Sequence, residues 1–228
     1  SNPLNIIDNY KQIRELKKRV DYVIVIIHGG YEYYNLPSPR MKKIYRFFAD
    51  IGADLIIGHH THCISGFEVY NDVPIIYSIG NFLFTKQSKY DNWYIGLLLK
   101  LNISKEKLNW EIIPIKQNKN NFIVSILEDE QKINVVNQIN KYSKIINDNK
   151  LLEDNWKYFI DKKNKEEIGL FSPINVINNT RIKKILRKFN FEKYFERKKR
   201  YITILNHLRC ESHLDVTLDI LKKKVYEE

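Results

Sequence analysis

The sequence is poor in cysteine and has no long apolar run. Its two cysteines, Cys63 and Cys210, are far apart and show no Cys-x-x-Cys spacing, which argues against a disulfide framework. No apolar stretch approaches the roughly 18–20 residues of a membrane span, and no signal peptide is visible. The single methionine is Met41 and the first residue is Ser1. We therefore expect this chain to be a piece of a longer protein whose natural N-terminus is missing.

Acidic residues are also in short supply. The chain has 27 Asp and Glu against 38 Lys and Arg, a formal net charge of +11. A basic balance of this size favours an anionic partner: a membrane surface, an acidic polymer or nucleic acid. The abundance of Lys, Asn and Ile can equally reflect nucleotide bias in a genome, so the charge alone does not choose a function. With 43% hydrophobic residues, the chain can form one sizeable domain or two small ones.

The first sixty residues predict a β-α-β unit. Residues 5–19 have apolar positions at helical spacing, and residues 21–30 contain a β-branched run that suits a strand buried on both faces. A helix is expected from Ser38, with Pro39 in its first turn. A second apolar strand follows at residues 53–62. Because neighbouring parallel strands end side by side, the residues that follow these two strands are expected to meet.

Antiparallel sheet and then helix are expected in the remainder of the chain. Residues 66–84 contain two β runs around an "ND" turn, and residues 92–116 form a second hairpin that turns at "SKEK". The capping-box spacing of Ser125 and Glu128 predicts the start of an amphipathic helix. Beyond that point the sequence predicts mostly helix.

Histidines gather at the ends of the two predicted parallel strands. Three of the six lie in "GHHTH", at His59, His60 and His62, and His28 follows the other strand. Since extended backbone has a two-residue period, His60 and His62 are expected to face one cavity, and His28 can supply a third imidazole. Three imidazoles suit Zn, Mn or Fe, either in a site with an open position or as part of a two-metal site. The alternative, that these histidines are ordinary core or surface residues, is weakened by their number and shared position.

Spaced motifs around these histidines resemble one family. The chain contains, in order, "HGGYEY", "GAD", "GHHTH" and "PIIYSIGNF". Over residues 20–117 this pattern resembles the C-terminal half of the CapA family of bacterial capsule and poly-γ-glutamate biosynthesis proteins, which have a calcineurin-like metallophosphoesterase fold. Small departures from the family pattern occur at Gly30, Thr61 and Ile79.

The resemblance implies a fold class and a domain division. The expected fold is α/β, part of a metallophosphoesterase-like α/β/β/α sandwich with a mixed sheet, followed by an α-helical C-terminal region. Residues 1–120 would hold the C-terminal half of the metallophosphoesterase domain, and residues 121–228 the helical tail region.

The resemblance also implies site residues. His28 is the expected lone metal ligand, and His60 and His62 are the expected ligand pair, for divalent Mn, Zn or Fe in the intact protein. His59 and Glu32 are the expected catalytic residues. Glu32 would bind the metal or orient His28, although a solvated loop acid remains an equal interpretation.

Motifs that the family carries earlier in its sequence are absent here. No Gly-Asp dipeptide occurs, and the Asn206-His207 pair lies far downstream, in the predicted helical tail. The two divalent ions of a two-metal site lie about 3.5–4 Å apart, and without a bridging anion they would repel each other strongly. Histidines alone do not supply that anion. We therefore expect no complete two-metal site in this chain and little or no turnover, with either a single bound ion or none. Asn81 is expected to face the site or to cap its turn.

Two kinds of partner are predicted. Half a sandwich leaves a sheet edge and an apolar face uncovered, so we expect either the missing N-terminal half of the same domain or self-association to cover them. Residues 181–200, "RIKKILRKFNFEKYFERKKR", are basic and amphipathic. They are interpreted as a solvated helix face, as an attachment to an anionic membrane surface or polymer, or, least favoured, as a nucleic-acid site.

Two functions follow for the intact protein. The first is a metal-dependent phosphoesterase-type hydrolase of capsule or anionic surface-polymer biosynthesis. The alternative is a non-catalytic assembly or binding subunit of a capsule synthesis or export complex, with a vestigial metal site. The resemblance implies a bacterial protein, of the cytoplasm or of the cell envelope, and the sequence does not decide between the two.

Overall fold

The computed structural model describes residues 5–170, 177, 179–189, 191 and 198–209. The chain divides into two compact units, Ser1–Phe159 and Ile160–Glu228. Each unit is described by itself.

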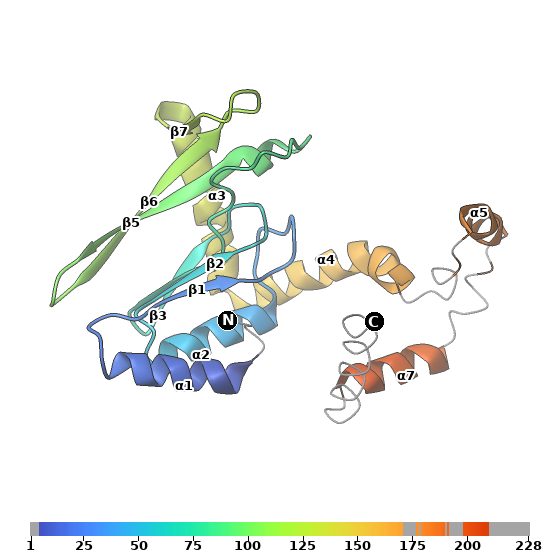
Figure 1. The fold of residues 1–228 in the computed structure, drawn as a ribbon, viewed down its shortest axis with the longest axis horizontal. Coiled ribbons are helices and arrows are strands. Elements are labelled where there is room, and N and C mark those ends of the chain that lie inside the picture. Colours follow the sequence, from blue (N-terminus) through green and yellow to red (C-terminus); the bar gives the residue numbers. More distant parts are fainter. Residues whose placement is uncertain (1–4, 171–176, 178, 190, 192–197, 210–228) are drawn as a thin grey trace, which may run out of the picture. The chain divides into compact units, whose positions relative to one another are not determined.

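A four-stranded mixed sheet of order β1-β2-β4-β3 forms the centre of the first unit (Figure 1). Strands β1 (Ile24–His28), β2 (Leu55–His59) and β4 (Val73–Ile76) are parallel, and β3 (Phe67–Tyr70) runs antiparallel to β4. Helix α2 (Pro39–Asp50) connects β1 to β2. The predicted β-α-β unit and the first predicted hairpin are therefore confirmed.

Helices α1 (Ile6–Lys17) and α2 cover one face of this sheet (Figure 1). The side chain of Ser38 caps α2 by accepting a hydrogen bond from the Met41 N–H at 3.1 Å, with Pro39 in the first turn, as predicted. The apolar faces of both helices meet the sheet in one core. Its most buried members include Tyr45, Phe48, Ile56, Ile75 and Tyr77.

A second, antiparallel sheet lies against the other face. It contains β5 (Ile95–Ile103), β6 (Leu108–Gln117) and β7 (Val124–Ile126), and the β5–β6 hairpin turns at "SKEK", as predicted. Apolar residues of both sheets form the core between them, where the rings of Phe67 and Trp110 lie 5.1 Å apart. The expected α/β class with a mixed sheet is confirmed.

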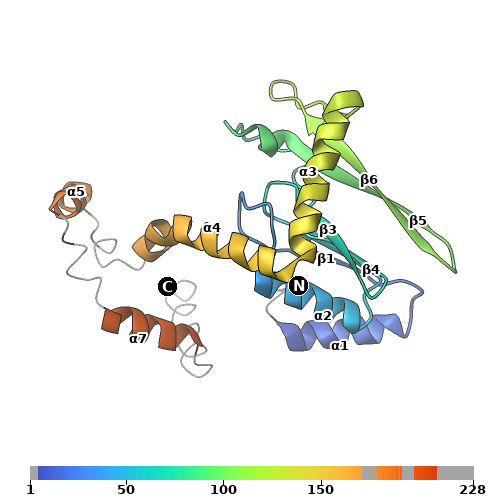
Figure 2. The same ribbon diagram turned by 180° about the vertical axis from the view of Figure 1, so that it is seen from behind.

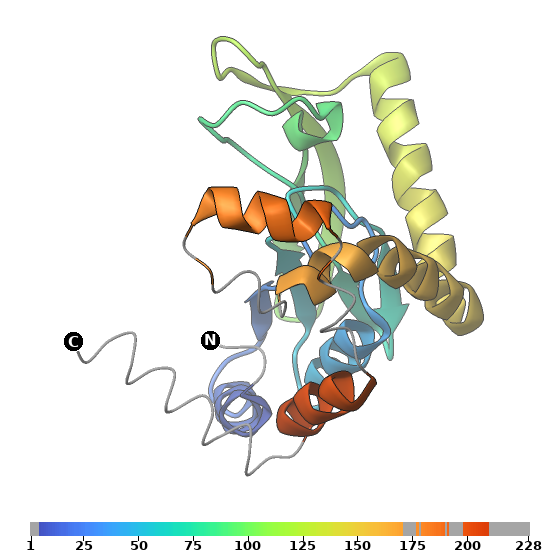
Figure 3. The ribbon, with the colours of Figure 1, turned by 90° about the vertical axis from the view of Figure 1, so that its right-hand side faces the viewer.

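Helix α3 (Asp129–Asn147) packs against β3 and β6 and so spans both sheets (Figures 2 and 3). The predicted capping box at its start is wrong, because Ser125 is a β7 residue paired with Lys116. Glu128 is the N-cap, and its side chain makes no capping hydrogen bond. Since β7 and α3 pack on the sheets, the boundary expected between residues 120 and 121 falls inside the first unit.

The described part of the second unit is helical. Helix α4 (Asn149–Leu170) begins in the first unit and ends in the second, which also holds α5 (Thr180–Lys188) and α7 (Lys198–Arg209). The last part of the predicted helical tail, residues 210–228, lies outside the described residues. Among the residues that the structure describes, no helix is both long and apolar enough to cross a membrane.

A buried charge network joins α2 to the mixed sheet. The Glu68 carboxylate, on β3, accepts two hydrogen bonds from Arg46, at 3.0 and 2.6 Å, and one from the Tyr77 hydroxyl at 2.6 Å. The Lys42 ammonium lies 3.9 Å from the same carboxylate and also donates to the Ile146 carbonyl. Burial lowers the pKa of Lys42, and the charge of Glu68 opposes that shift.

This network makes Glu68 a sensitive position for stability. We expect Glu68→Gln to lower the free energy of unfolding by about 3–5 kcal/mol, because it leaves the buried charges of Lys42 and Arg46 without a counter-ion. Urea denaturation measures this change. The control is Glu111→Gln, because the side chains of Glu111 and Lys100 are about 60% exposed and such a surface pair contributes at most about 1 kcal/mol. Equal effects of the two substitutions would show that the network does not hold the sheet to α2.

Candidate metal centre at the strand ends

Parallel pairing brings the histidines together. His28 and His59 are register partners at the last positions of β1 and β2, and the Gly29 N–H donates to the His59 carbonyl at 2.9 Å. The His28 ring centroid lies 5.8 Å from that of His59 and 4.5 Å from that of His60. The His60 and His62 centroids are 6.1 Å apart. Four imidazoles, predicted from strand-end position alone, therefore share one site.

The backbone of the histidine segment is bent, not extended as the sequence argument assumed. His60 has a φ of 105° and His62 a φ of 57°, both in the left-handed region that residues with a side chain rarely adopt. The two rings converge because the chain turns sharply after β2, and not because of the two-residue period of a strand. Non-glycine residues hold such conformations only where surrounding contacts enforce them, which is common at functional sites.

Asn81 fixes the orientation and tautomer of His62. The Asn81 amide nitrogen donates to the Trp93 carbonyl at 2.9 Å, so its oxygen is the atom that faces His62 Nδ1, also at 2.9 Å. An amide oxygen only accepts, so we assign the proton of neutral His62 to Nδ1, which leaves the Nε2 lone pair for a ligand. Asn81 is buried. Of its two expected roles, facing the site is the one that the structure shows.

His59 is held in the complementary way. Its Nδ1 accepts a hydrogen bond from the His60 backbone N–H at 2.8 Å. Burial, and then the neighbouring imidazoles, lower the pKa of His59. Burial also lowers the pKa of His60, followed by the charge of His28, while Glu32 raises it. Both shifts favour neutral imidazole, which is the form that binds metal ions.

Glu32 lies in the turn after β1 and is exposed to solvent. The negative charge of Glu32 raises the pKa of His60, and this electrostatic effect connects Glu32 to the histidines. In the part of the chain that the structure describes, no group of three or more His, Cys, Asp or Glu side chains has an arrangement that could hold a metal ion. The roles predicted for His28, His60, His62, His59 and Glu32 therefore stay predictions.

The chemistry of the donors fits one divalent ion better than two. The described residues supply imidazoles and one carboxylate, Glu32, that acts electrostatically on His60, and three imidazoles suit a single ion with an open position. Two adjacent divalent ions require a bridging anion, which the imidazoles do not provide.

An aromatic wall beside His62 was not predicted. The ring centroids of Trp93 and Phe84 lie 4.7 and 5.0 Å from that of His62, and Tyr33 lies 6.2 Å away. Trp93 lies in a 3-10 helix (Asp91–Tyr94) that leads into β5. Only the three-dimensional fold brings this segment to the histidines, although the concentration of aromatic residues between Phe82 and Trp93 was a visible signal.

Comparison with known proteins gives a consistent result. Residues 5–86 match the family described as "Bacterial capsule synthesis protein PGA_cap". The chain is 49% identical over 72 residues to "PGA biosynthesis protein CapA" of Bacillus subtilis, a match over 32% of this chain and 19% of that protein. It is 42% identical over 84 residues to "Capsule biosynthesis protein CapA" of Bacillus anthracis, over 36% of this chain and 20% of that protein. The matches thus span about a fifth of the length of these curated relatives.

The bend at His60 generates a prediction about stability. We expect His60→Gly to be more stable than His60→Ala by about 1 kcal/mol, because glycine adopts a φ of 105° without strain and alanine does not. At ordinary positions in regular structure the order is reversed, since glycine loses more backbone entropy on folding. Chemical denaturation of the two variants checks this. A more stable alanine variant would show that the segment is unstrained.

Proposed function

We propose that this chain, whose residues 5–86 match the bacterial capsule synthesis protein family, works in the synthesis of a bacterial capsule polymer and uses its strand-end histidines to hold one divalent metal ion. The observation that carries the proposal is the convergence of four imidazoles, with Asn81 fixing one tautomer. The printed names of two curated relatives, which concern capsule and PGA biosynthesis, support the biological role.

His28, His60 and His62 are the residues that would hold the ion, with Mn, Zn or Fe as the candidate metals. A bound divalent ion supplies Lewis acidity toward a phosphoryl or carbonyl oxygen and lowers the pKa of a coordinated water. Within this arrangement Asn81 acts on His62 as a positioning residue. His59 and the exposed Glu32 are the proposed groups for proton transfer, because both lie next to the imidazoles.

A further polypeptide segment is proposed to complete the site. Strand β1 is an edge of the mixed sheet and pairs with β2 alone among the described strands. Its residue Ile26 is 68% exposed, so neither the second sheet nor a helix covers that position. An acidic segment paired along this edge would cover Ile26 and bring carboxylates toward His28. It would belong to the same protein or to a second chain, and phosphoester hydrolysis is proposed only for the completed site.

A second candidate is a non-catalytic assembly or binding subunit. The observation that favours it is the absence, among the described residues, of an arranged group of three metal-binding side chains. In that case the histidine segment stabilises the fold or binds a partner, and it does not bind a metal ion. The two candidates differ in whether the histidines bind a divalent ion.

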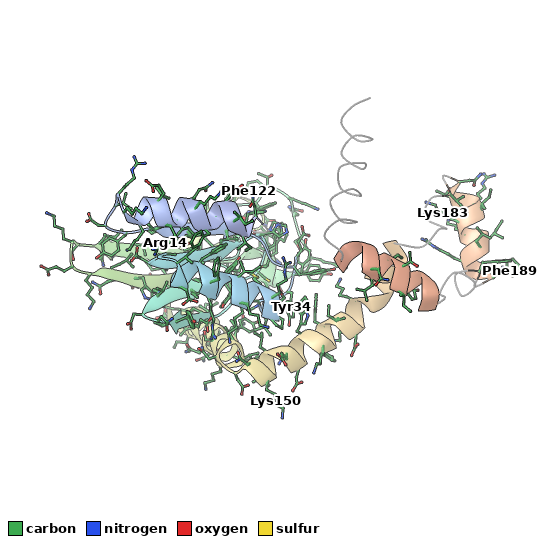
Figure 4. The ribbon with its side chains drawn as sticks, turned by 90° about the horizontal axis from the view of Figure 1, so that it is seen from below. Arg14, Tyr34, Phe122, Lys150, Lys183 and Phe189 are labelled. Carbon is green, nitrogen blue, oxygen red and sulfur yellow. The ribbon has the colours of Figure 1, made fainter. Side chains whose placement is uncertain are left out.

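The second unit is proposed to contact an anionic surface through α5. Five basic residues lie on this helix, and its apolar residues Ile182 and Ile185 are exposed, as is Phe189 at its C-cap. Figure 4 shows Lys183 and Phe189 on this segment. A basic helix with an exposed apolar stripe is suited to the headgroup region of an anionic membrane or to an anionic polymer. Residues 190 and 192–197 of the basic stretch lie outside the described residues.

Metal binding tests the main proposal. We expect isothermal titration of the metal-free chain with Zn²⁺ to show about one ion per chain. Binding should weaken about 10–100-fold in Asn81→Leu, because His62 loses the group that orients it, and should weaken further in His62→Ala. The control is Asn155→Leu, since the Asn155 amide bonds only the Leu151 carbonyl on an exposed helix face. Thermal melting of each variant checks that it is folded.

Two outcomes would contradict the metal centre. One is the absence of Zn²⁺ binding at micromolar concentration in the folded chain, which would favour the non-catalytic subunit. The other is binding that survives His62→Ala unchanged, which would place the ion elsewhere.

Vesicle flotation tests the proposed anionic surface. We expect the chain to float with vesicles that contain phosphatidylserine and to float less after Lys183→Glu, because each basic residue near such a surface contributes about 1 kcal/mol of attraction. The matched control is Lys150→Glu on exposed α4, which should float like the wild-type chain. Equal flotation of both variants, or flotation with neutral vesicles alone, would contradict a role for α5.

A further inference from the structure

A cavity of about 260 Å³ is lined in part by the loop that follows β1. The end of β1 and the glycine-containing loop border it from one side, α2 from the second, and α4 from the third. Its lining includes Ile27, Tyr34, Arg40, Met41, Tyr45 and Trp156. All of these belong to the first unit.

Two tyrosine hydroxyls of the cavity lining are left without hydrogen-bond partners. The hydroxyl oxygens of Tyr34 and Tyr45 are both buried and unpaired. Tyr45 as a whole is only 2% exposed. A buried hydroxyl without a partner loses its hydrogen bonds to water on folding, and in native proteins such groups are rare. The two hydroxyls are therefore candidate donors to a ligand or a water that reaches them from the cavity.

The other residues that line the cavity indicate which kind of ligand would fit it. Ile27, Met41 and the Trp156 ring form apolar surface. The Tyr34 ring is stacked on Phe159, with centroids 4.1 Å apart, and lies tilted against Trp156 at 5.6 Å. Arg40 brings a positive charge and is exposed. It takes part in none of the ion pairs found among the described residues. Arg40 lies in the first turn of the twelve-residue helix α2, where the helix dipole adds a partial positive charge.

We propose that this cavity binds a compact organic carboxylate with an apolar body, with the carboxylate at Arg40 and the start of α2 and the body between Ile27, Met41 and Trp156. The two tyrosine hydroxyls then donate to ligand oxygens or to a water held with the ligand. Burial raises the pKa of Tyr34 to about 12 and raises that of Tyr45 as well, so both remain protonated donors at neutral pH. Arg40 pairs with a carboxylate through two parallel N–H groups.

One loop connects the cavity to the histidine segment. The loop from Gly29 to Tyr34 borders the cavity and also carries Glu32 and Tyr33. The Tyr33 N–H donates to the Thr61 carbonyl at 2.8 Å, inside the histidine segment. A ligand in the cavity would therefore order the loop that holds Glu32 next to His60. The proposal does not rest on a bound metal, and its test is carried out in the presence of a chelator.

Phenylacetate is the probe, and phenylacetamide is its uncharged match of the same size. Isothermal titration of the 228-residue chain is expected to show phenylacetate binding with a Kd of about 1 mM or tighter, as its ten heavy atoms allow. Phenylacetamide is expected to bind about tenfold more weakly, and acetate, which lacks the apolar body, not to bind measurably.

Three variants locate the binding. Arg40→Gln should weaken phenylacetate about tenfold and leave phenylacetamide unchanged, and Arg14→Gln, on the exposed face of α1, should change neither (Figure 4). Tyr45→Phe should weaken both probes several-fold. Its melting temperature without ligand should be equal to or higher than that of the wild-type chain, because the substitution removes an unpaired buried hydroxyl.

Three results would overturn the proposal. The first is the absence of phenylacetate binding up to about 10 mM in a folded chain. The second is equal binding of phenylacetate to wild type and Arg40→Gln. The third is a lower melting temperature of Tyr45→Phe without ligand, which would show that ordered water already satisfies the hydroxyl and that the cavity is a hydrated void.

Discussion

The candidate metal centre depends on the parallel, in-register pairing of β1 with β2. That pairing places His28 opposite His59 at the last ladder position, so the segments that follow both strands begin from the same point. A slip of one residue would turn each side chain to the opposite face and would separate His28 from the other imidazoles. The register is maintained by the apolar residues of β2 and by Ile27 of β1, which are buried between the helices and the second sheet.

The site combines a rigid support with a strained segment. Below it, the Glu68 network and the core hold α2 against the sheet. Above it, His60 and His62 lie in left-handed conformations, and Asn81 with the Trp93 carbonyl sets the orientation of one ring. Strain of this kind persists when neighbouring contacts determine the geometry more strongly than local preference does. The imidazoles are thus placed by the fold, before any ligand arrives.

The sequence was sufficient to predict the β-α-β unit, because β-branched runs, a Ser-Pro helix start and strand-end histidines are local signals. It predicted both hairpins for the same reason. It was not sufficient for the shape of "GHHTH", since no local signal predicts a positive φ for His60 or His62. The start of α3 was misjudged because Ser125 has the spacing of a helix cap and yet pairs with Lys116 in a sheet. Tertiary pairing overrode the local preference.

The contribution of Trp93 lay beyond the sequence, since it is 31 positions from His62 and belongs to no recognisable ligand pattern. Asn81 belongs to the "PIIYSIGNF" motif, and facing the site was one of its two expected roles. The proposed donor set beside Asn81 and Trp93 is made of imidazoles, and bound metal would distinguish this proposal from one in which the histidines only pack. X-ray absorption spectroscopy of the Zn²⁺-loaded chain tests this most directly. The account predicts three imidazole nitrogens at about 2.0–2.1 Å from a single zinc ion. A spectrum with oxygen ligands alone, or no zinc retained by the folded chain, would contradict it.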